Sequence, residues 1–211
     1  MAIRRLRLSD LGGNNMADHS VVTKERFDQG FRYQDYIDQI NVNKDRFQRY
    51  YDTATDVVDE NDTKDFKDLM NGPGGATRVM VVGEDWCPDV YRGMPLIARI
   101  AEVSGMDLRI FPRDSHLDIM NEFLKDGQFQ SIPAVVFYTE GHEYLCHWIE
   151  RPALANKDMA EINNKIETEM AGQDEQTVRR ARRDQINGRF PDWQKATVQE
   201  LKELISKVVN K

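Results

Sequence analysis

A Trp-Cys-Pro-Asp-Val stretch at residues 86–90 contains the side chain with the greatest chemical potential in the chain, the thiol of Cys87. Pro88 follows it, and proline is favoured in the first turn of a helix. We therefore expect Cys87 at a helix N-terminus, where unpaired N–H groups and the positive end of the helix dipole stabilise a thiolate. This makes Cys87 the candidate nucleophile, with Trp86 shielding one side of the thiol.

The charges near this cysteine in the sequence act against the helix dipole. Glu84, Asp85 and Asp89 lie within three residues of Cys87, and the nearest basic residue in the sequence is Arg92. A nearby carboxylate raises the pKa of a thiol. We expect a weakly activated thiol, and an acidic rim that favours a cationic substrate over an anionic one.

The remaining reactive residues predict no second site. Cys146 is the only other cysteine, and we expect it to pack in a strand as a small hydrophobe. The four histidines have no ligand spacing, so we expect no metal site and no cofactor. The arginine-rich run at residues 178–183 reads as a solvated helix face. A nucleic-acid role for this run is not expected; it could instead dock the acidic part of another copy in a homodimer.

The elements that position Cys87 follow from hydrophobic periodicity and breaker residues. Helices are expected over residues 24–71, and a Gly-Pro-Gly-Gly break ends them. The expected order thereafter is β-α-β-α-β-β, with two parallel crossovers and a final antiparallel hairpin. Its strands are expected at residues 78–83, 107–111, 133–138 and 144–149, and its helices at residues 87–103 and 114–124. Three helices should follow, at residues 152–170, at residues 174–186 and after a break at residues 188–191.

Four features in this order resemble the thioredoxin fold over residues 75–150. They are the β-α-β-α-β-β order, Trp86-Cys87-Pro88, a proline eight residues after the cysteine, and Ile132-Pro133 opening the third strand. The resemblance implies an α/β fold with a central mixed sheet flanked by helices, here with extra N- and C-terminal helices. It also implies that Pro133 is cis and, with Ile132, clamps a substrate backbone opposite Cys87. The other substrate-contacting residues that it implies are Trp86, Pro88, Asp89 and Val90.

Two departures from the family pattern limit the chemistry that the resemblance implies. Val90 stands where thioredoxins have their second cysteine, and Val81 stands where they commonly have a buried aspartate. A dithiol cycle therefore cannot run within this motif. The leading hypothesis is a monothiol redox protein, whose substrate is a protein or small-molecule thiol or disulfide and whose exchange an external thiol completes. The alternative is a catalytically inactive module that binds a peptide or protein at the cis-proline cleft.

Composition and charge set the wider expectations. The chain has 211 residues and a formal net charge of −7, which argues against nucleic-acid and anionic-membrane partners. It has no apolar run of membrane-spanning length and no secretory leader pattern, so we expect a cytoplasmic protein. We expect residues 1–20 to be a disordered or added extension, 21–74 an N-terminal helical extension, and 75–151 the thioredoxin-like core. Residues 152–211 should form C-terminal helices that pack on this core.

Overall fold

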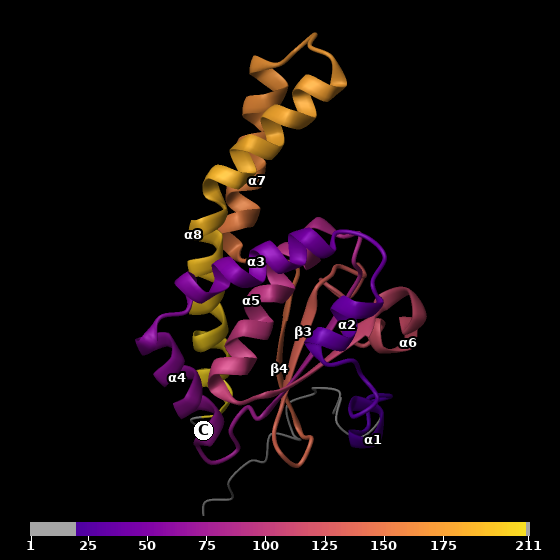
Figure 1. Ribbon diagram of the computed structural model, residues 1–211, viewed down its shortest axis with the longest axis vertical. Coiled ribbons are helices and arrows are strands. Elements are labelled where there is room, and N and C mark those ends of the chain that lie inside the picture. Colours follow the sequence, from indigo (N-terminus) through magenta and orange to yellow (C-terminus); the bar gives the residue numbers. More distant parts are fainter. Residues whose placement is uncertain (1–19, 210–211) are drawn as a thin grey trace, which may run out of the picture.

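A four-stranded mixed sheet forms the centre of the protein in a computed structural model that describes residues 20–209 (Figure 1). The expectation for residues 1–19 lies outside this range. The strands are β1 (Arg78–Gly83), β2 (Asp107–Pro112), β3 (Ala134–Tyr138) and β4 (Tyr144–Ile149), arranged in the order β2-β1-β3-β4. β1 is parallel to β2, whereas the β1–β3 and β3–β4 pairs are antiparallel.

The prediction of a second parallel crossover is wrong, because the chain between β2 and β3 stays at one edge of the sheet. Pro112 at the end of β2 is level with Gly83, and Ala134 at the start of β3 is level with Val82. The predicted helix over residues 114–124 shrinks to the 3-10 turn η3 (Arg113–Ser115) and the short α6 (Leu117–Met120). No long helix returns the chain along the sheet before β3 begins, so β3 starts at the edge where β2 ends and runs opposite to β1.

Helix α5 (Pro88–Ser104) packs on the sheet and is covered in turn by α3 (Lys44–Val57) and α4 (Glu60–Asn71). The other two N-terminal helices are α1 (Lys24–Phe27) and α2 (Tyr33–Gln39), of which α2 packs against β2. Phe47 and Ala54, seven residues apart on α3, are fully buried. The main hydrophobic cluster extends without a break from these helices through the sheet to the C-terminal helix. Burial of this continuous apolar surface supplies the driving force that holds the helices on the sheet.

The C-terminal residues form an antiparallel hairpin of α7 (Ala153–Glu169) and α8 (Glu175–Val209). Its outer end projects beyond the rest of the protein in Figure 1. The last third of α8 buries Val198, Leu201 and Ile205 in the main cluster. The rest of the hairpin is held by a second, smaller cluster, to which both α7 and α8 contribute.

The prediction that the chain breaks at residues 188–191 is wrong, because α8 continues through Pro191. Contacts on both sides of this proline hold the helix in place. The Phe190 ring lies edge-on to Tyr50 of α3, with 4.9 Å between centroids. The Trp193 indole N–H donates to Asp158 of α7 at 2.7 Å. Tertiary packing thus overrides the local helix-breaking tendency of Pro191, whose ring is exposed.

The length and the apolar character of a helix decide whether it can cross a membrane. Among the helices of residues 20–209, including the 35-residue α8, none combines the length and the apolar character needed to cross a membrane.

Replacing Pro191 by alanine is expected to stabilise the protein. Proline in a helix interior costs about 3 kcal/mol relative to alanine, and the substitution restores one backbone donor. We expect Pro191→Ala to raise the free energy of unfolding by about 1–3 kcal/mol, measured by urea denaturation. Pro73→Ala, in the exposed turn before β1, is the control and should give no such gain. A destabilised Pro191→Ala protein would contradict the account of α8 as a continuous helix held by its flanking contacts.

Candidate active site around Cys87

Cys87 is the N-cap residue of α5, and Pro88 occupies the first helical position, as the sequence predicted. The residue is 8% exposed. It donates a hydrogen bond to the carbonyl oxygen of Ile132 across a distance of 3.8 Å. The Ile132–Pro133 peptide bond is cis, the conformation that the resemblance implies. Cys87, Ile132 and Pro133 therefore come together in one site.

The antiparallel course of β3 brings these three residues together. Because β3 runs opposite to β1, its first residues reach the edge of the sheet where β1 ends. Gly93 of α5 faces Pro133, and a Cβ at Gly93 would lie 3.6 Å from the Pro133 ring. A parallel β3 would have carried Pro133 to the opposite edge, away from the thiol.

Val90 fills the position of the missing second cysteine. Its side chain is fully buried. A Cβ added to Gly83 would lie 2.9 Å from a Val90 methyl, so the end of β1 approaches α5 more closely than any residue other than glycine allows. Val90 therefore secures α5 to the sheet, one turn after Cys87.

The pKa of the Cys87 thiol is raised above its ordinary value, and burial is the largest cause. The N–H groups of Val90 and Asp89 at the helix start lower it, the Asp89 carboxylate raises it, and the more distant Arg151 lowers it. A weakly activated thiol was predicted from the neighbouring carboxylates, whereas burial is the larger cause.

The other two acidic neighbours in the sequence are bonded elsewhere. Glu84 accepts a hydrogen bond from the Asp114 N–H at 2.7 Å. The Asp85 carboxylate accepts from the N–H groups of Asn41 and Val42, at 3.0 and 3.2 Å. Asp85 thus ties the loop before α3 to the loop before Cys87, and Glu84 ties the η3 turn to the same loop. Both carboxylates are thus held by backbone N–H groups of neighbouring loops.

Sequence reasoning missed an ion-pair network beside the thiol. Arg151 pairs with Asp89 at 3.0 Å and also with Glu150, which pairs with Lys125 at 2.5 Å. Burial raises the pKa of Asp89 despite Arg151. Burial would raise the pKa of Glu150 too, but the hydrogen bonds from Lys125 and Arg151 hold it below its usual value.

The direction of β4 is the feature from which this ion-pair network could have been predicted. Glu150 and Arg151 directly follow β4. Since β4 is antiparallel to β3, and β3 to β1, β4 runs in the same direction as β1 and ends at the same edge. With the expected parallel β3, the end of β4 would have lain at the far edge.

Apolar surface lies next to the buried thiol. Trp86 is 49% exposed, and the Arg113 guanidinium lies over its ring at 5.0 Å from the centroid. Pro88 is also exposed. Together they give a substrate an accessible contact surface beside Cys87, whereas Val90 and Pro133 are buried beneath it.

Cys146 lies too far from Cys87 to resolve a mixed disulfide in this fold. It pairs with Phe137, which pairs with Val79 near the start of β1. Val79 and the end of β1 are separated by about 13 Å along the strand, and Cys146 lies two further strand spacings of about 4.8 Å away. Cys146 is 6% exposed, and burial raises its pKa to about 12.

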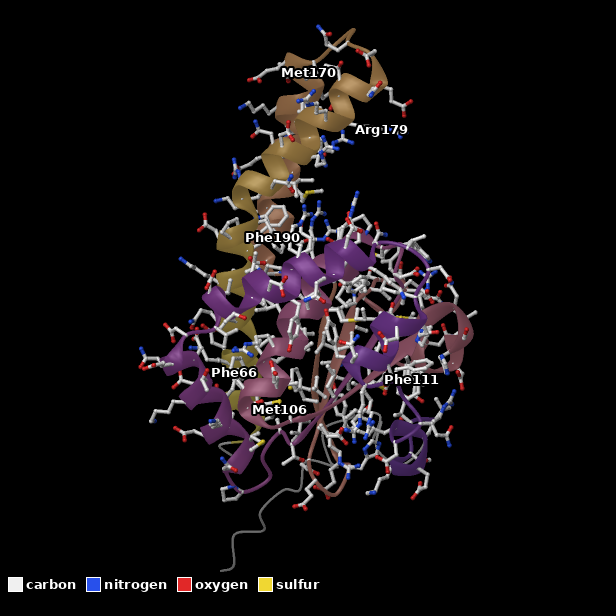
Figure 2. The ribbon with its side chains drawn as sticks, in the orientation of Figure 1. Phe66, Met106, Phe111, Met170, Arg179 and Phe190 are labelled. Atoms are coloured by element: carbon white, nitrogen blue, oxygen red, sulfur yellow. The ribbon has the colours of Figure 1, made fainter. Side chains whose placement is uncertain are left out.

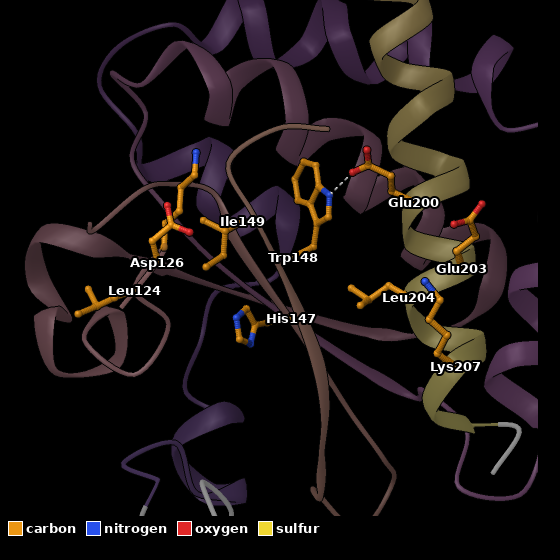
Figure 3. Close-up of a pocket in the computed structure, with 10 residues that line it drawn as sticks. Leu124, Asp126, His147, Trp148, Ile149, Glu200, Glu203, Leu204 and Lys207 are labelled. Carbon is orange, nitrogen blue, oxygen red and sulfur yellow. Dashed lines mark hydrogen bonds between the residues drawn. The ribbon is translucent and has the colours of Figure 1, made fainter. Parts of the chain in front are cut away.

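Other features of the described chain offer no second reactive centre. Within residues 20–209, no group of three or more His, Cys, Asp or Glu side chains could hold a metal ion. A pocket of about 420 Å³ lies between the outer edge of β4, the loop before β3 and α8 (Figure 3). Its wall includes Trp148, whose indole N–H donates to Glu200 at 2.9 Å. No cysteine lines this pocket, and its Trp148–Glu200 contact fixes α8 to the sheet.

Neutralising Asp89 is expected to lower the pKa of Cys87. Asp89→Asn removes the carboxylate that raises this pKa and frees Arg151, which lowers it. Thiolate absorbance against pH, in a Cys146→Ala background, should place Cys87 above the ordinary thiol value of about 8.5 and show a downward shift in the variant. Asp68→Asn, on the exposed face of α4, is the control. A pKa well below 7 in the parent protein would overturn this electrostatic account.

The fold recurs in solved structures of low sequence identity. A crystal structure of a protein of unknown function, PA1234 from Pseudomonas aeruginosa, has a TM-score of 0.60 and 14% identity. The match covers 89% of this chain and 99% of that one. An HIV epitope-scaffold, 4E10, has a TM-score of 0.61 and 15% identity, covering 90% of this chain and 99% of that one. These shares exceed the thioredoxin-like core, so the likeness includes flanking helices.

No curated protein matches the sequence. A family model described as thioredoxin matches residues 30–165, which is more than half of the chain. The matched range of residues spans β1 to β4. With its mixed sheet, the cysteine at the start of α5 and the facing proline, the chain belongs to the thioredoxin-like family.

Proposed function

We propose that this protein carries out monothiol thiol–disulfide exchange, with Cys87 as the nucleophile and an external thiol completing the reaction. The observation that carries the proposal is the contact between the Cys87 thiol, at the start of α5, and the Ile132 carbonyl beside the cis proline. A disulfide bound against Ile132 and Pro133 would lie next to the sulfur that attacks it.

The exchange takes two steps that balance without a second cysteine. In the first, the Cys87 thiolate attacks one sulfur of a substrate disulfide, the disulfide bond breaks, and the other sulfur leaves as a thiolate. In the second, the thiolate of an external molecule attacks the mixed disulfide and releases the Cys87 thiolate. The raised pKa makes the first step slow at neutral pH and faster as pH rises, because more of Cys87 is then thiolate.

The residues around Cys87 take distinct roles in this proposal. Within residues 20–209, the Ile132 N–H has no backbone hydrogen-bond partner, which leaves it available to an extended substrate. The Pro133 carbonyl accepts from the Glu150 N–H at 2.8 Å and is not free in the same way. Trp86 offers an apolar wall, and Asp89 tunes the thiol pKa through its pairing with Arg151. A reducing cytoplasm, in which both cysteines stay thiols, is the proposed setting.

A second candidate is a catalytically inactive module that binds a peptide or protein partner at the same cleft. The burial of Cys87 and its raised pKa favour this candidate. The apolar residues at positions 81 and 90 favour it too, since they replace the resolving thiol and its base. In this alternative, Ile132 and Trp86 recognise the partner and the sulfur takes no part.

Substitution of Cys87 separates the two functions. Reduced protein exposed to a panel of small disulfides across a pH series should gain a reversible adduct, located on Cys87 by peptide mapping. Cys87→Ser should abolish this adduct, and the control Cys146→Ser should keep it. A parent protein that stays unmodified even above pH 9, while still binding peptides as Cys87→Ser does, would establish the binding module instead.

Restoring the second cysteine is expected to allow an internal disulfide. Residues three apart on a helix have Cβ atoms about 5–6 Å apart, which a local shift at the helix start can bring into disulfide range. On mild oxidation, Val90→Cys should therefore form a disulfide between position 90 and Cys87. Intact mass should show this as the loss of two hydrogens. Val90→Ala is the matched control for the lost packing against Gly83. A Val90→Cys protein that folds and keeps both thiols reduced would mean that this loop no longer permits the family's geometry.

A further inference from the structure

A cleft of about 990 Å³ opens beside the Cys87 motif. Pro88, Asp89 and Tyr91 of α5 form one wall, α3 forms a second, and the α7–α8 hairpin forms a third. Figure 2 shows Arg179 towards the outer end of this hairpin and Phe190 where the hairpin meets the body of the protein. The volume lies at the upper end of the range of about 300–1,000 Å³ found for small-molecule sites.

The cleft is strongly basic although the chain as a whole is acidic. Seven arginines line it against two aspartates, which gives it a net charge of +5 within a chain of −7. The arginines come from α3, α5, α8 and the residue pair after β4, and they are Arg46, Arg49, Arg92, Arg151, Arg179, Arg182 and Arg183.

Several of these guanidinium groups have no acidic partner. Within residues 20–209, no carboxylate lies within 4.0 Å of Arg46, Arg49, Arg92 or Arg182, whereas Arg151 is paired with Asp89. The Nε of Arg92 is also buried without a hydrogen-bond partner. Like charges gathered around a cleft repel one another, so an anion that binds among them relieves this repulsion and gains charge-assisted hydrogen bonds.

Aromatic side chains complete the walls. Tyr50 and Tyr91 both line the cleft, and their rings stack with 6.3 Å between centroids. Arg46 donates to the Tyr91 hydroxyl at 2.7 Å. Trp193 lies on the opposite, hairpin side. A ligand in this cleft therefore meets arginines from several directions together with flat apolar surface, a combination that suits an organic molecule carrying phosphate groups.

We infer that this cleft binds the phosphate groups of a small-molecule thiol, and that this thiol is the external partner of Cys87. The inference rests on the proposed function, of which it names the substrate class. Arginine forks recognise phosphate oxygens from several sides at once, and Pro88 and Asp89 place one end of the cleft next to the reactive sulfur. The expected preference for cationic substrates is replaced by a preference for anionic ones, because the tertiary fold gathers arginines that are distant in the sequence in the cleft beside Pro88 and Asp89.

Binding is tested first without any redox step. Inorganic pyrophosphate titrated into the full chain in a calorimeter should bind, with an affinity that falls as salt is added. The double variant Arg46→Gln/Arg182→Gln removes one unpaired guanidinium from each side of the cleft and should weaken binding at least about 10-fold. The matched control is Arg180→Gln, which lies on α8 outside the cleft and should bind as the parent does. Equal affinity in all three proteins, or no binding in the parent, would overturn the inference.

Two disulfides then test the link to Cys87. Coenzyme A disulfide and pantethine share the reacting arm, but only the former carries phosphate groups. We expect coenzyme A disulfide to modify Cys87 at least about 10-fold faster, as followed by intact mass, with pyrophosphate competing. The Arg46→Gln/Arg182→Gln variant should lose this preference, and the control Arg180→Gln, which lies outside the cleft, should keep it.

The outcomes separate this inference from the proposed function. Equal rates for the two disulfides would overturn the phosphate-bearing thiol and leave monothiol exchange standing. Pyrophosphate binding with no modification by either disulfide would overturn both the exchange and the thiol assigned here, leaving an anion site alone. Self-association that the double variant abolishes, without pyrophosphate binding, would overturn the inference in favour of a second copy docked on the arginines.

Discussion

The close contact between the end of β1 and the start of α5 is the constraint on which the rest of the site depends. Gly83 has no side chain, so Val90 and Met94 can pack directly against the strand. This contact fixes the first turn of α5, and the first turn fixes Cys87 at the N-cap. It also explains how the fold persists without a second cysteine, because Val90 contributes packing where a thiol would contribute chemistry. The cleft begins one residue later, at Pro88.

Around this contact, the groups that act on the Cys87 thiol come both from its own helix start and from the edge of the sheet. Asp85 and Glu84 accept hydrogen bonds from neighbouring loops, and the charged groups that shift the Cys87 pKa are Asp89 and Arg151. Burial still dominates the thiol pKa. The result is a thiol whose pKa is raised by burial, next to a cleft in which arginines outnumber aspartates. Low intrinsic reactivity combined with a specific binding cleft would restrict exchange to ligands that the cleft holds in place.

The helical extensions are part of the site and not only additions to it. α3 covers α5 and supplies one wall of the cleft, and the α7–α8 hairpin supplies another. The hairpin is anchored at its base by Val198, Leu201 and Ile205 and by the pairing of Lys202 with Asp62 of α4 at 2.6 Å. Its outer half depends on its own small cluster. Removing the hairpin would therefore open the cleft without removing Cys87, Ile132 or Pro133.

The sequence by itself determined the elements of the sheet, the helix start at Cys87 and its meeting with Ile132–Pro133. These depend on local periodicity, on Pro88 at a helix start and on motifs that recur in order across a family. Only the tertiary structure decided the direction of β3, the continuity of α8 through Pro191 and the charges around the thiol. The physical reason is the range of the interactions. Patterns along the chain report each residue's immediate neighbours. Arg151 instead pairs with Asp89 beside Cys87 because β4 ends at the edge where α5 begins, and the cleft arginines converge because three helices pack together.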